Sequence, residues 1–519
     1  MRVCTPEQAA AMVPDGATIV VDGSGGGVNE PAAVIDALEL RFLEHAAPRD
    51  LTLFHVSGMG SANGDGIDRF AHVGMVRRVI GGHWGWSRNL QEMAADEQVE
   101  AYCLPQGTLS HLLRDIAAGR PGNISRVGLG TFVDPRVEGG RLNRSATEPI
   151  NELITLRGEE FLFTPSLPID VAVVRGSTAD ELGNITMESE GMYAETLAAA
   201  QAAKNSGGIV IAQVRELVPP GTLVAGHVRI PGVLVDALVV DPTQRLSFAT
   251  ERDAVLEGRE RAETLSVPAL PLNERKVIAR RAAAALVTGD VVNLGFGMPD
   301  GVAAVLVEED LGAAVTFTVE QGHIGGVPAW GTDFGLARNA DASFDEGSQF
   351  DWYDGGGIDT AVLSFAELDV KGDVNVSRFG RRAPGIGGFV NISQGASRVV
   401  FVGTFTAKGP WEVSDEGIRL PPSGKQKLVE RVEQISFSAA QALHAGRQIL
   451  YVTERAVFKL TESGPMLIEI APGVDLQRDV LDQMGFVPPI AEHLTEIDRA
   501  VYASGRMGLR LQPGKDGGA

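Results

Sequence analysis

A lone carboxylate opens an unusually glycine-rich stretch of this 519-residue chain, TVEQGHIGGVPAWG at residues 318–331. The apolar and β-branched run Ala313–Val319 leads into Glu320, and three glycines follow within the next six residues. A carboxylate at the end of a buried strand, next to a loop with few side chains, can attack an activated acyl group and form a covalent intermediate. The same position also suits a residue that caps a following helix, so position alone leaves both interpretations open.

Acyl transfer makes two further demands that glycine loops can meet. The substrate must approach closely, and the oxyanion of a tetrahedral intermediate needs preorganised N–H donors. Glycines leave the backbone amides accessible and carry no Cβ that would block the approach. Residues 322–326 and Gly385–Gly388 have this composition, so we expect these loops to supply the donors.

The motifs of several other kinds of site lack a required residue in this sequence. A dinucleotide-binding GxGxxG motif needs a third glycine where Val28 follows the first Gly-x-Gly and Asp300 follows the second. A P-loop ending at Gly424-Lys425 would have Arg419 in place of its first glycine and Gln426 in place of Ser or Thr. No HExxH or GxSxG motif occurs, and the nine histidines have no metal-like spacing. We therefore expect neither a metal site nor a serine hydrolase site.

The composition is typical of a soluble globular protein with more than one domain. No run of about eighteen apolar residues predicts a transmembrane helix, and the net charge of −22 argues against nucleic acid as a partner. Cys4 and Cys103 form no CxxC or Cys/His cluster, which fits a reducing compartment. Thr5-Pro6-Glu7 predicts a helix start rather than part of a signal peptide.

The chain contains an internal repeat. DVAVVRGSTADELGNI (170–185) and DTAVLSFAELDVKGDV (359–374) share Asp at the first position, Ala-Val at the third and fourth, Asp at the eleventh and Gly at the fourteenth. Each pattern predicts a buried strand and a tight turn at Asp-x-x-Gly. A second apolar run begins 39 residues after each first Asp, at Ile209 (209 − 170) and at Arg398 (398 − 359).

Residues 8–25 and 281–297 extend the repeat upstream, because both predict a helix, a turn, a strand and a Gly-x-Gly loop. Alternation of such strands with helices, as at residues 30–46 and 300–311, predicts an α/β fold of two related open α/β domains with parallel sheets. Ligands of such folds bind at the carboxyl ends of the strands. The Gly-x-Gly loops and Glu320 are expected at that edge.

The two related halves define the expected domains. We predict a first domain over residues 1–265, a linker over residues 266–275 with the Pro- and Leu-rich sequence SVPALPLNER, and a second domain over residues 276–519 that carries Glu320. The charged segment 251–265 is predicted to be a helix that ends the first domain.

Several strings resemble family I coenzyme A-transferases of the acetate/propionate type. They occur in that family's order, from about residue 15 to about residue 490, and are long enough to be specific. They are GGHWGW (81–86), AYCLPQGTLSHLLRDIAAGRPG (101–122), VGLGTFVDPR (127–136), NLGFGMPDGVA (293–303), EQGHIGGVPAWG (320–331), QFDWYDGGGID (349–359), NVSRFG (375–380) and GIGGFVNIS (385–393). Related α-like and β-like halves are joined in one chain or form separate subunits in that family, which agrees with the repeat.

The resemblance implies ping-pong transfer of coenzyme A (CoA) between an acyl-CoA and a free short-chain carboxylic acid through a glutamyl-CoA thioester. The family's catalytic glutamate falls on Glu320, and its Gly-Gly loop falls on Gly387 and Gly388, which would form the oxyanion hole. The CoA-contacting loop would consist of Gly295, Phe296, Gly297, Met298 and Pro299. The substrate pocket would include Gly25, Gly26, His323 and Trp330, and the last two are predicted to narrow it around the acyl group.

Three alternatives use the same residues differently. Water could intercept the anhydride and make the protein an acyl-CoA thioesterase. The fold also occurs in carrier-protein acyl-exchange subunits of the citrate-lyase type, which depend on partner subunits, and a non-catalytic CoA-sensing or scaffold protein is the third. Both halves in one chain and an intact Glu320 favour the transferase. The resemblance further implies a cytoplasmic homo-oligomer that uses CoA as a substrate and has no prosthetic group.

Overall fold

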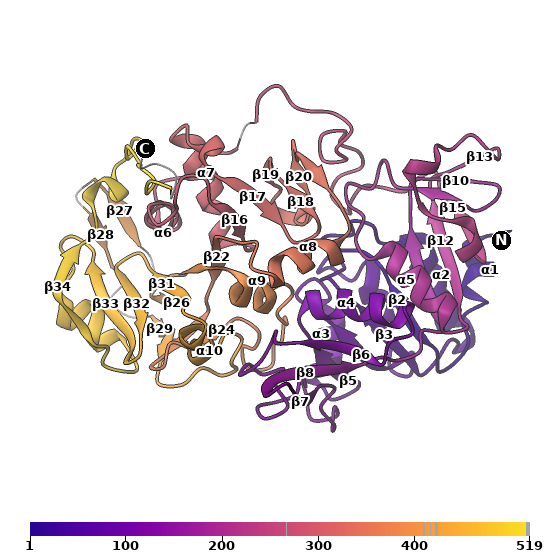
Figure 1. Ribbon diagram of the computed structural model, residues 1–519, viewed down its shortest axis with the longest axis horizontal. Coiled ribbons are helices and arrows are strands. Elements are labelled where there is room, and N and C mark those ends of the chain that lie inside the picture. Colours follow the sequence, from indigo (N-terminus) through magenta and orange to yellow (C-terminus); the bar gives the residue numbers. More distant parts are fainter. Residues whose placement is uncertain (266, 408–410, 416, 421–423, 515–519) are drawn as a thin grey trace.

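The protein forms two α/β halves that lie side by side (Figure 1). The structure is a computed structural model that describes residues 1–265, 267–407, 411–415, 417–420 and 424–514. The first half runs from indigo to magenta in Figure 1 and the second from pink through orange to yellow. This arrangement places the carboxyl ends of strands from both halves near their common boundary.

The first half is built on an eight-stranded sheet in which all neighbouring strands are parallel. Its order is β1 (Arg2–Val3), β15 (Ala237–Val240), β12 (Ile209–Val214), β9 (Val171–Arg175), β2 (Thr18–Val21), β3 (Leu51–His55), β4 (Val76–Gly81) and β5 (Glu100–Cys103). The helices of this half are α1 (Pro6–Ala10), α2 (Ala32–His45), α3 (Arg88–Ala95), α4 (Gln106–Ala117) and α5 (Thr196–Asn205). α1 begins with the predicted cap, since Thr5 and Gln8 form a capping box.

Two small sheets accompany this half. One is β6 (Gly122–Ser125), β8 (Glu159–Pro165) and β7 (Glu152–Leu156), and the other is β13 (Glu216–Val218), β10 (Thr178–Asp180), β11 (Ile185–Thr186) and β14 (Val228–Ile230).

The second half is built on a ten-stranded mixed sheet. Its order is β21 (Ala342–Ser343), β18 (His323–Ile324), β17 (Thr316–Val319), β16 (Val291–Leu294), β22 (Thr360–Ser364), β25 (Arg398–Val402), β31 (Gln448–Val452), β32 (Ala456–Thr461), β33 (Gly464–Ile470) and β34 (Ile490–Glu496). The run from β17 to β31 is parallel, and antiparallel pairs flank it on both sides. The helices are α6 (Glu274–Ala283), α7 (Gly301–Glu308), α8 (Glu346–Asp354), α9 (Phe389–Gly395) and α10 (Ala439–His444).

The structure confirms the internal repeat down to single hydrogen bonds. The order β3-β2-β9-β12-β15 of the first sheet recurs as β17-β16-β22-β25-β31 in the second. Asp170 Oδ2 accepts the N–H of Thr18 (2.7 Å), and Asp359 Oδ2 accepts the N–H of Val291 (2.9 Å). Each Asp therefore precedes one strand and holds the start of its neighbour, which explains why both copies of the repeat open with Asp.

Helices cover both faces of the second sheet, so its central strands are buried on each side. Ala361 and Leu363 of β22 pack in the same cluster as Phe350 of α8 and Phe389 of α9. Val362, between them, points to the other face and packs in the cluster formed with α6 and α7. This burial on both faces accounts for the continuous apolar runs of the sequence.

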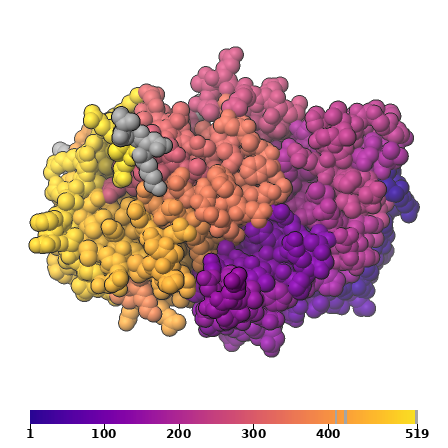
Figure 2. Space-filling view, in the orientation of Figure 1, coloured from indigo at the N-terminus to yellow at the C-terminus, as the bar shows by residue number. Residues whose placement is uncertain are grey.

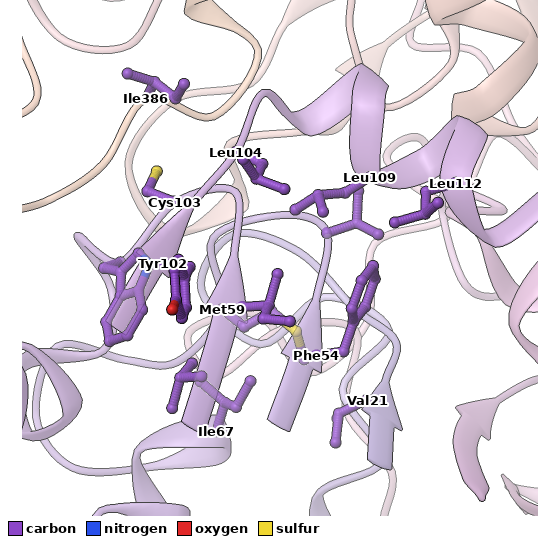
Figure 3. Packing of buried hydrophobic residues seen from close by; sticks show 14 of the residues in the cluster. Val21, Phe54, Met59, Ile67, Tyr102, Cys103, Leu104, Leu109, Leu112 and Ile386 are labelled. Carbon is purple, nitrogen blue, oxygen red and sulfur yellow. The ribbon is translucent and has the colours of Figure 1, made fainter. Parts of the chain in front are cut away.

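The two halves share one hydrophobic core. α8 packs against α4 across the boundary, and the surfaces of the two halves meet without a gap in Figure 2. Figure 3 shows Ile386 of the second half beside Cys103, the last residue of β5, and Leu104, which follows it, and all three belong to one cluster of buried residues. The loops at this boundary are therefore fixed by contacts from both sides.

The predicted helix over residues 251–265 is wrong, because these residues form turns. Asp253 Oδ1 accepts N–H groups of the turn that follows it, and Oδ2 pairs with Arg338 of the second half (2.7 Å). Leu256 is buried with Leu336, also from the second half. These contacts between halves override the local helix propensity. The predicted linker begins at Ser266, which lies outside the described residues.

Among the residues that the structure describes, no helix combines the length and the apolar character of a membrane span. In those same residues no group of three or more His, Cys, Asp or Glu side chains is arranged to hold a metal ion. Cys4 and Cys103 are both free thiols.

Candidate active site

Glu320 lies directly after β17, at the carboxyl edge of the second sheet. β16 is the parallel neighbour of β17, so Gly295 after β16 emerges at the same edge. The chain turns back at once, because the N–H of Gly322 donates to Val319 O (3.0 Å). Gly322 has φ +109°, and a Cβ there would collide with the carbonyl oxygen of Phe344. This turn therefore requires glycine.

A cavity of about 490 Å³ opens beside Glu320 where the two halves meet. Its size is typical of a small-molecule site, and its lining is mostly apolar side chains and glycines. The first half contributes Ser24, Gly25, His83, Trp86 and Gln106, and the second half contributes Gly295, Phe296, Glu320, Phe334 and residues 384–389.

The carboxyl group of Glu320 is largely removed from water, and the residue is only 7% exposed. Burial raises the pKa of Glu320 above its ordinary value, while hydrogen bonds from the Glu320 backbone, Asn293 and Gln321 oppose the rise. Asn293 of β16 brings Nδ2 to 3.4 Å from Glu320 Oε2. Tyr353 O–H, which donates to Thr318 Oγ1 (2.7 Å), lies on the other side of Asn293 Nδ2. An ionised Glu320 in this setting has few donors to satisfy it, which leaves it reactive towards a carbonyl carbon.

Of the two glycines predicted to form the oxyanion hole, Gly387 has its N–H occupied. It donates to Gly82 O (2.7 Å), and Gly387 O accepts the backbone N–H of Gln106 (3.0 Å). Gly388 faces the carboxylate, since a Cβ built on it would lie 3.5 Å from Glu320 Cγ. Within the described chain no acceptor takes the Gly388 N–H. That amide is therefore available to a ligand in the cavity.

Gly25 and Gly26 bring the loop after β2 against the second half. The N–H of Gly26 donates to Thr332 O (3.1 Å), and a Cβ on Gly25 would collide with the carbonyl oxygen of Phe334. Gly25 lines the cavity, whereas Gly26 lies outside the lining. The close approach of these two backbones explains why the loop needs glycine.

The predicted CoA-contacting loop follows β16, and its first two residues, Gly295 and Phe296, line the cavity. Its remaining residues do not line the cavity. Gly297 has φ +92°, its N–H donates to Asp300 Oδ2 (3.1 Å), and its carbonyl accepts from Arg275 Nη2 (2.7 Å). Asp300 and Arg275 thus fix the loop at Gly297, while the half-exposed Phe296 ring faces the cavity.

His323 and Trp330 lie outside the cavity lining. His323 is buried in β18 with Nδ1 2.8 Å from Ser343 Oγ, and burial lowers its pKa to about 4, so the ring is neutral at physiological pH. Trp330 is 41% exposed, where the chain leaves β19 (Val327–Pro328). The acyl-pocket role expected for these two residues stays a prediction.

Comparison with known proteins decides the family. A family model described as "Coenzyme A transferase" matches residues 3–241. The chain is 46% identical to the caffeate CoA-transferase of Acetobacterium woodii over 99% of this chain and 100% of that protein. The chain belongs to the coenzyme A-transferase family.

Two further comparisons extend this finding to the fold and the reaction. The transferase is 41% identical to the acetate CoA-transferase YdiF of Escherichia coli (strain K12), over 98% of this chain and 96% of that protein. A crystal structure of acyl-CoA transferase YdiF from E. coli O157:H7, a thioester complex with CoA, matches with a TM-score of 0.94 and 40% identity over 99% of this chain and 98% of that chain. The predicted fold and family are confirmed. This enzyme is therefore a CoA-transferase.

Several residues of the transferase's cavity were not identified from the sequence. Trp86 and Phe334 flank Phe296 edge-to-face, at centroid distances of 5.8 and 5.3 Å. Gln106 and Trp86 both lie inside strings that resemble the family. The sequence therefore indicated these segments, but not which of their residues line the cavity. Asn293 also lies inside such a string (293–303), but its contact with Glu320 depends on the pairing of β16 with β17.

Proposed function

We propose that Glu320 is the nucleophile of this coenzyme A-transferase. A Glu320 carboxylate oxygen attacks the thioester carbonyl carbon, and the tetrahedral intermediate collapses by breaking the C–S bond, so that CoA leaves as a thiolate. The acyl group then forms a mixed anhydride with Glu320. The thiolate attacks the Glu320 carbonyl carbon, which gives the glutamyl-CoA thioester and releases the first carboxylate. A second carboxylate attacks the glutamyl-CoA thioester, and the same two steps in reverse release it as the new acyl-CoA.

The position of Glu320 opposite the unoccupied Gly388 amide carries this proposal. Both attacks create an oxyanion, and an unoccupied backbone N–H beside the carboxylate can donate a hydrogen bond to it. We assign this donor role to Gly388. Gly387, whose N–H and carbonyl are both bound to the first half, holds the loop in place.

The half-reaction without an acceptor acid tests the covalent route. When the enzyme is mixed with an acyl-CoA alone, the route through Glu320 predicts release of about one carboxylate per active site, with the CoA retained on the protein. Quenched-flow measurement of the released acid gives this number directly. Continuous release would instead indicate hydrolysis, and no release would contradict a covalent intermediate.

The apolar cavity supports an acid with a flat, apolar acyl group as substrate. Trp86, Phe296 and Phe334 form a row of edge-to-face rings on its wall, and planar conjugated groups pack well against such rings. The 46% identical relative is named a caffeate CoA-transferase, which agrees with this choice. We propose aryl-propenoic acids as the class that the cavity accepts better than acetate.

The variant Trp86→Leu is expected to lower kcat/KM for cinnamate about three- to tenfold relative to acetate, the effect of losing one aromatic contact. Both acids are assayed with one acyl-CoA donor. The matched variant Trp330→Leu tests the residue singled out from the sequence. If Trp330→Leu changed the preference for cinnamate over acetate and Trp86→Leu did not, the assignment of the acyl group to the aromatic row would be overturned.

We also propose, on the family resemblance, that Gly295 and Phe296 contact the CoA arm and that the enzyme works as a cytoplasmic homo-oligomer without a prosthetic group. Remote binding of that arm would then help to position the thioester over Glu320. Light scattering of the purified protein measures its mass in solution. A mass of 54.8 kDa would mean a monomer and contradict the oligomer.

A further inference from the structure

Three carboxyl groups are buried together at the boundary between the halves, next to the proposed site. Asp22 follows β2 and Glu195 precedes α5 in the first half, whereas Glu346 begins α8 in the second. They are 3%, 4% and 0% exposed, respectively. Buried carboxylates normally have a cation or several donors to compensate their charge. The hydrogen bonds that each of these three carboxyl groups makes therefore indicate whether the group is ionised or protonated.

Glu346 is satisfied as an anion. Gln106 Nε2 donates to Glu346 Oε1 (2.6 Å), and Ser57 Oγ donates to both carboxylate oxygens (3.4 and 3.3 Å). The Glu346 backbone N–H also bonds to Ala194 O of the first half (3.2 Å). Glu346 is therefore anchored to the first half through its main chain and its side chain.

An ionised Glu195 would be poorly compensated, because the hydroxyl of Ser110 is, among the described residues, the one side-chain donor beside it that favours the charged form. Neither of its buried carboxyl oxygens receives a hydrogen bond from the donors of the described chain. The carboxyl group of Glu346 lies within hydrogen-bonding reach of it, and the hydroxyl of Ser110 is the other polar group beside it. A neutral carboxylic acid can donate to the Glu346 carboxylate, whereas an ionised one cannot. Asp22 differs, because it accepts from Thr196 Oγ1 and from the Glu195 N–H.

Gln106 connects this pair to the cavity. Its Nε2 donates to Ser57 Oγ (2.8 Å) as well as to Glu346, which uses both amide hydrogens. Its Oε1 faces Gly387, since a Cβ on Gly387 would lie 3.3 Å from that oxygen. Gln106 also lines the cavity and binds Gly387 O through its backbone N–H. Because the Glu346 carboxylate accepts from Gln106 Nε2, the carbonyl oxygen is the end of the Gln106 carboxamide that faces the cavity.

We propose that Glu346 and Glu195 share one proton, and that this pair is a positioning device that holds Gln106 with its carbonyl oxygen towards Gly387 and the cavity. Glu346 and Glu195 do not touch substrate in this proposal. They act through Gln106, which supports the loop carrying Gly388. The inference rests on the proposed site, because Gln106 lies in the same cavity wall as Glu320.

The electrostatic surroundings agree with a retained proton. Burial and the charges of Glu320 and Asp22 raise the pKa of Glu346, whereas hydrogen bonds from Gln106 and Glu195 lower it. Burial and the charges of Glu346 and Asp22 raise the pKa of Glu195 well above its ordinary value. Loss of the shared proton at high pH would put two adjacent negative charges behind Gln106. The other charged or titratable side chains around the pair are His55, which burial keeps neutral, Asp345, Arg229 and the Arg114–Asp351 ion pair.

Two variants and a double-mutant cycle test the proposal. Glu195→Gln keeps an N–H donor opposite Glu346 but cannot ionise, so the alkaline fall of kcat is expected to move to higher pH. Glu346→Gln removes the anionic acceptor and is expected to lower kcat at least about tenfold by displacing Gln106, with KM for the acyl-CoA unchanged. Glu462→Gln, an exposed glutamate in the same half, is the matched control and should leave the pH profile as in the wild type.

The cycle combines Glu346→Gln with Gln106→Met. If Glu346 acts through Gln106, the double variant is no slower than Gln106→Met alone. Fully additive losses, or an alkaline limb that Glu195→Gln does not move, would overturn the proposal. Should Glu346→Gln fail to fold, the pH profile of Glu195→Gln still decides. Detection of a CoA adduct on wild-type Glu320 that borohydride removes tests the proposed nucleophile separately, so the two failures are distinguishable.

Discussion

Glu320→Gln is expected to lower kcat for CoA transfer by at least about 10⁴-fold, because an amide cannot form the anhydride or the thioester. The substitution keeps the size of the side chain and its place beside Asn293, so the protein should fold and still bind acyl-CoA. Initial rates with an acyl-CoA and an acceptor acid give kcat, and calorimetry gives the affinity for CoA.

Glu320→Asp and Glu462→Gln are the controls for this experiment. Aspartate retains a carboxylate but withdraws it by one methylene, so we expect a smaller loss of about 10²-fold. The same Glu-to-Gln change at exposed position 462 should have no effect. A Glu320→Gln enzyme with near-normal turnover would show that another group carries the covalent step.

Gly388→Pro is expected to lower kcat by about 10²- to 10³-fold, with a small change in KM, because it deletes the N–H assigned to the oxyanion. Gly388 has φ −76° and ψ −6°, a φ that proline also adopts. Gly388 is not part of a β-strand, and its N–H makes no hydrogen bond within the described chain. The deleted donor is therefore the main loss expected from this change.

Gly388→Ala isolates the effect of the added carbon from that of the lost donor. A Cβ there would lie 3.1 Å from Ile392 Cδ1, 3.3 Å from Phe350 Cζ and 3.5 Å from Glu320 Cγ, so the Ile392 and Phe350 side chains must each shift by a few tenths of an ångström. Alanine keeps the N–H, so this variant should retain most of the activity. Equal losses for alanine and proline would contradict the donor role and indicate steric exclusion instead.

Local patterns were sufficient for the parts of the fold that repeat. The opening Asp170 and Asp359 of the two copies, and the strands that follow them, are in the structure where the sequence predicts them. Segment 251–265 was predicted wrongly because its conformation depends on Arg338 and Leu336 of the other half. The strands beyond β31, of which β32 and β33 are antiparallel to their neighbours and β34 is parallel to β33, carry no repeat and were not predicted. The domain limits stay a prediction.

The site shows the same division between local and long-range information. Glu320 could be identified because a strand, a carboxylate and a glycine turn are consecutive in the sequence. The difference between Gly387 and Gly388 could not, since it depends on Gly82 O from the other half taking one N–H and not the other. Likewise the Gln106–Glu346 bond joins residues 240 positions apart, a contact that only the docked halves create.

Peptide mass mapping after incubation with an acyl-CoA tests the central claim most directly. Trypsin should release residues 282–338 as one peptide, which contains Glu308 and Glu309 as well as Glu320. We predict a CoA-sized adduct whose fragment ions place it on Glu320 and which borohydride removes by reducing the thioester. An adduct on another residue, or an unmodified peptide while the enzyme turns over the same acyl-CoA, would contradict the assignment of Glu320 as the nucleophile.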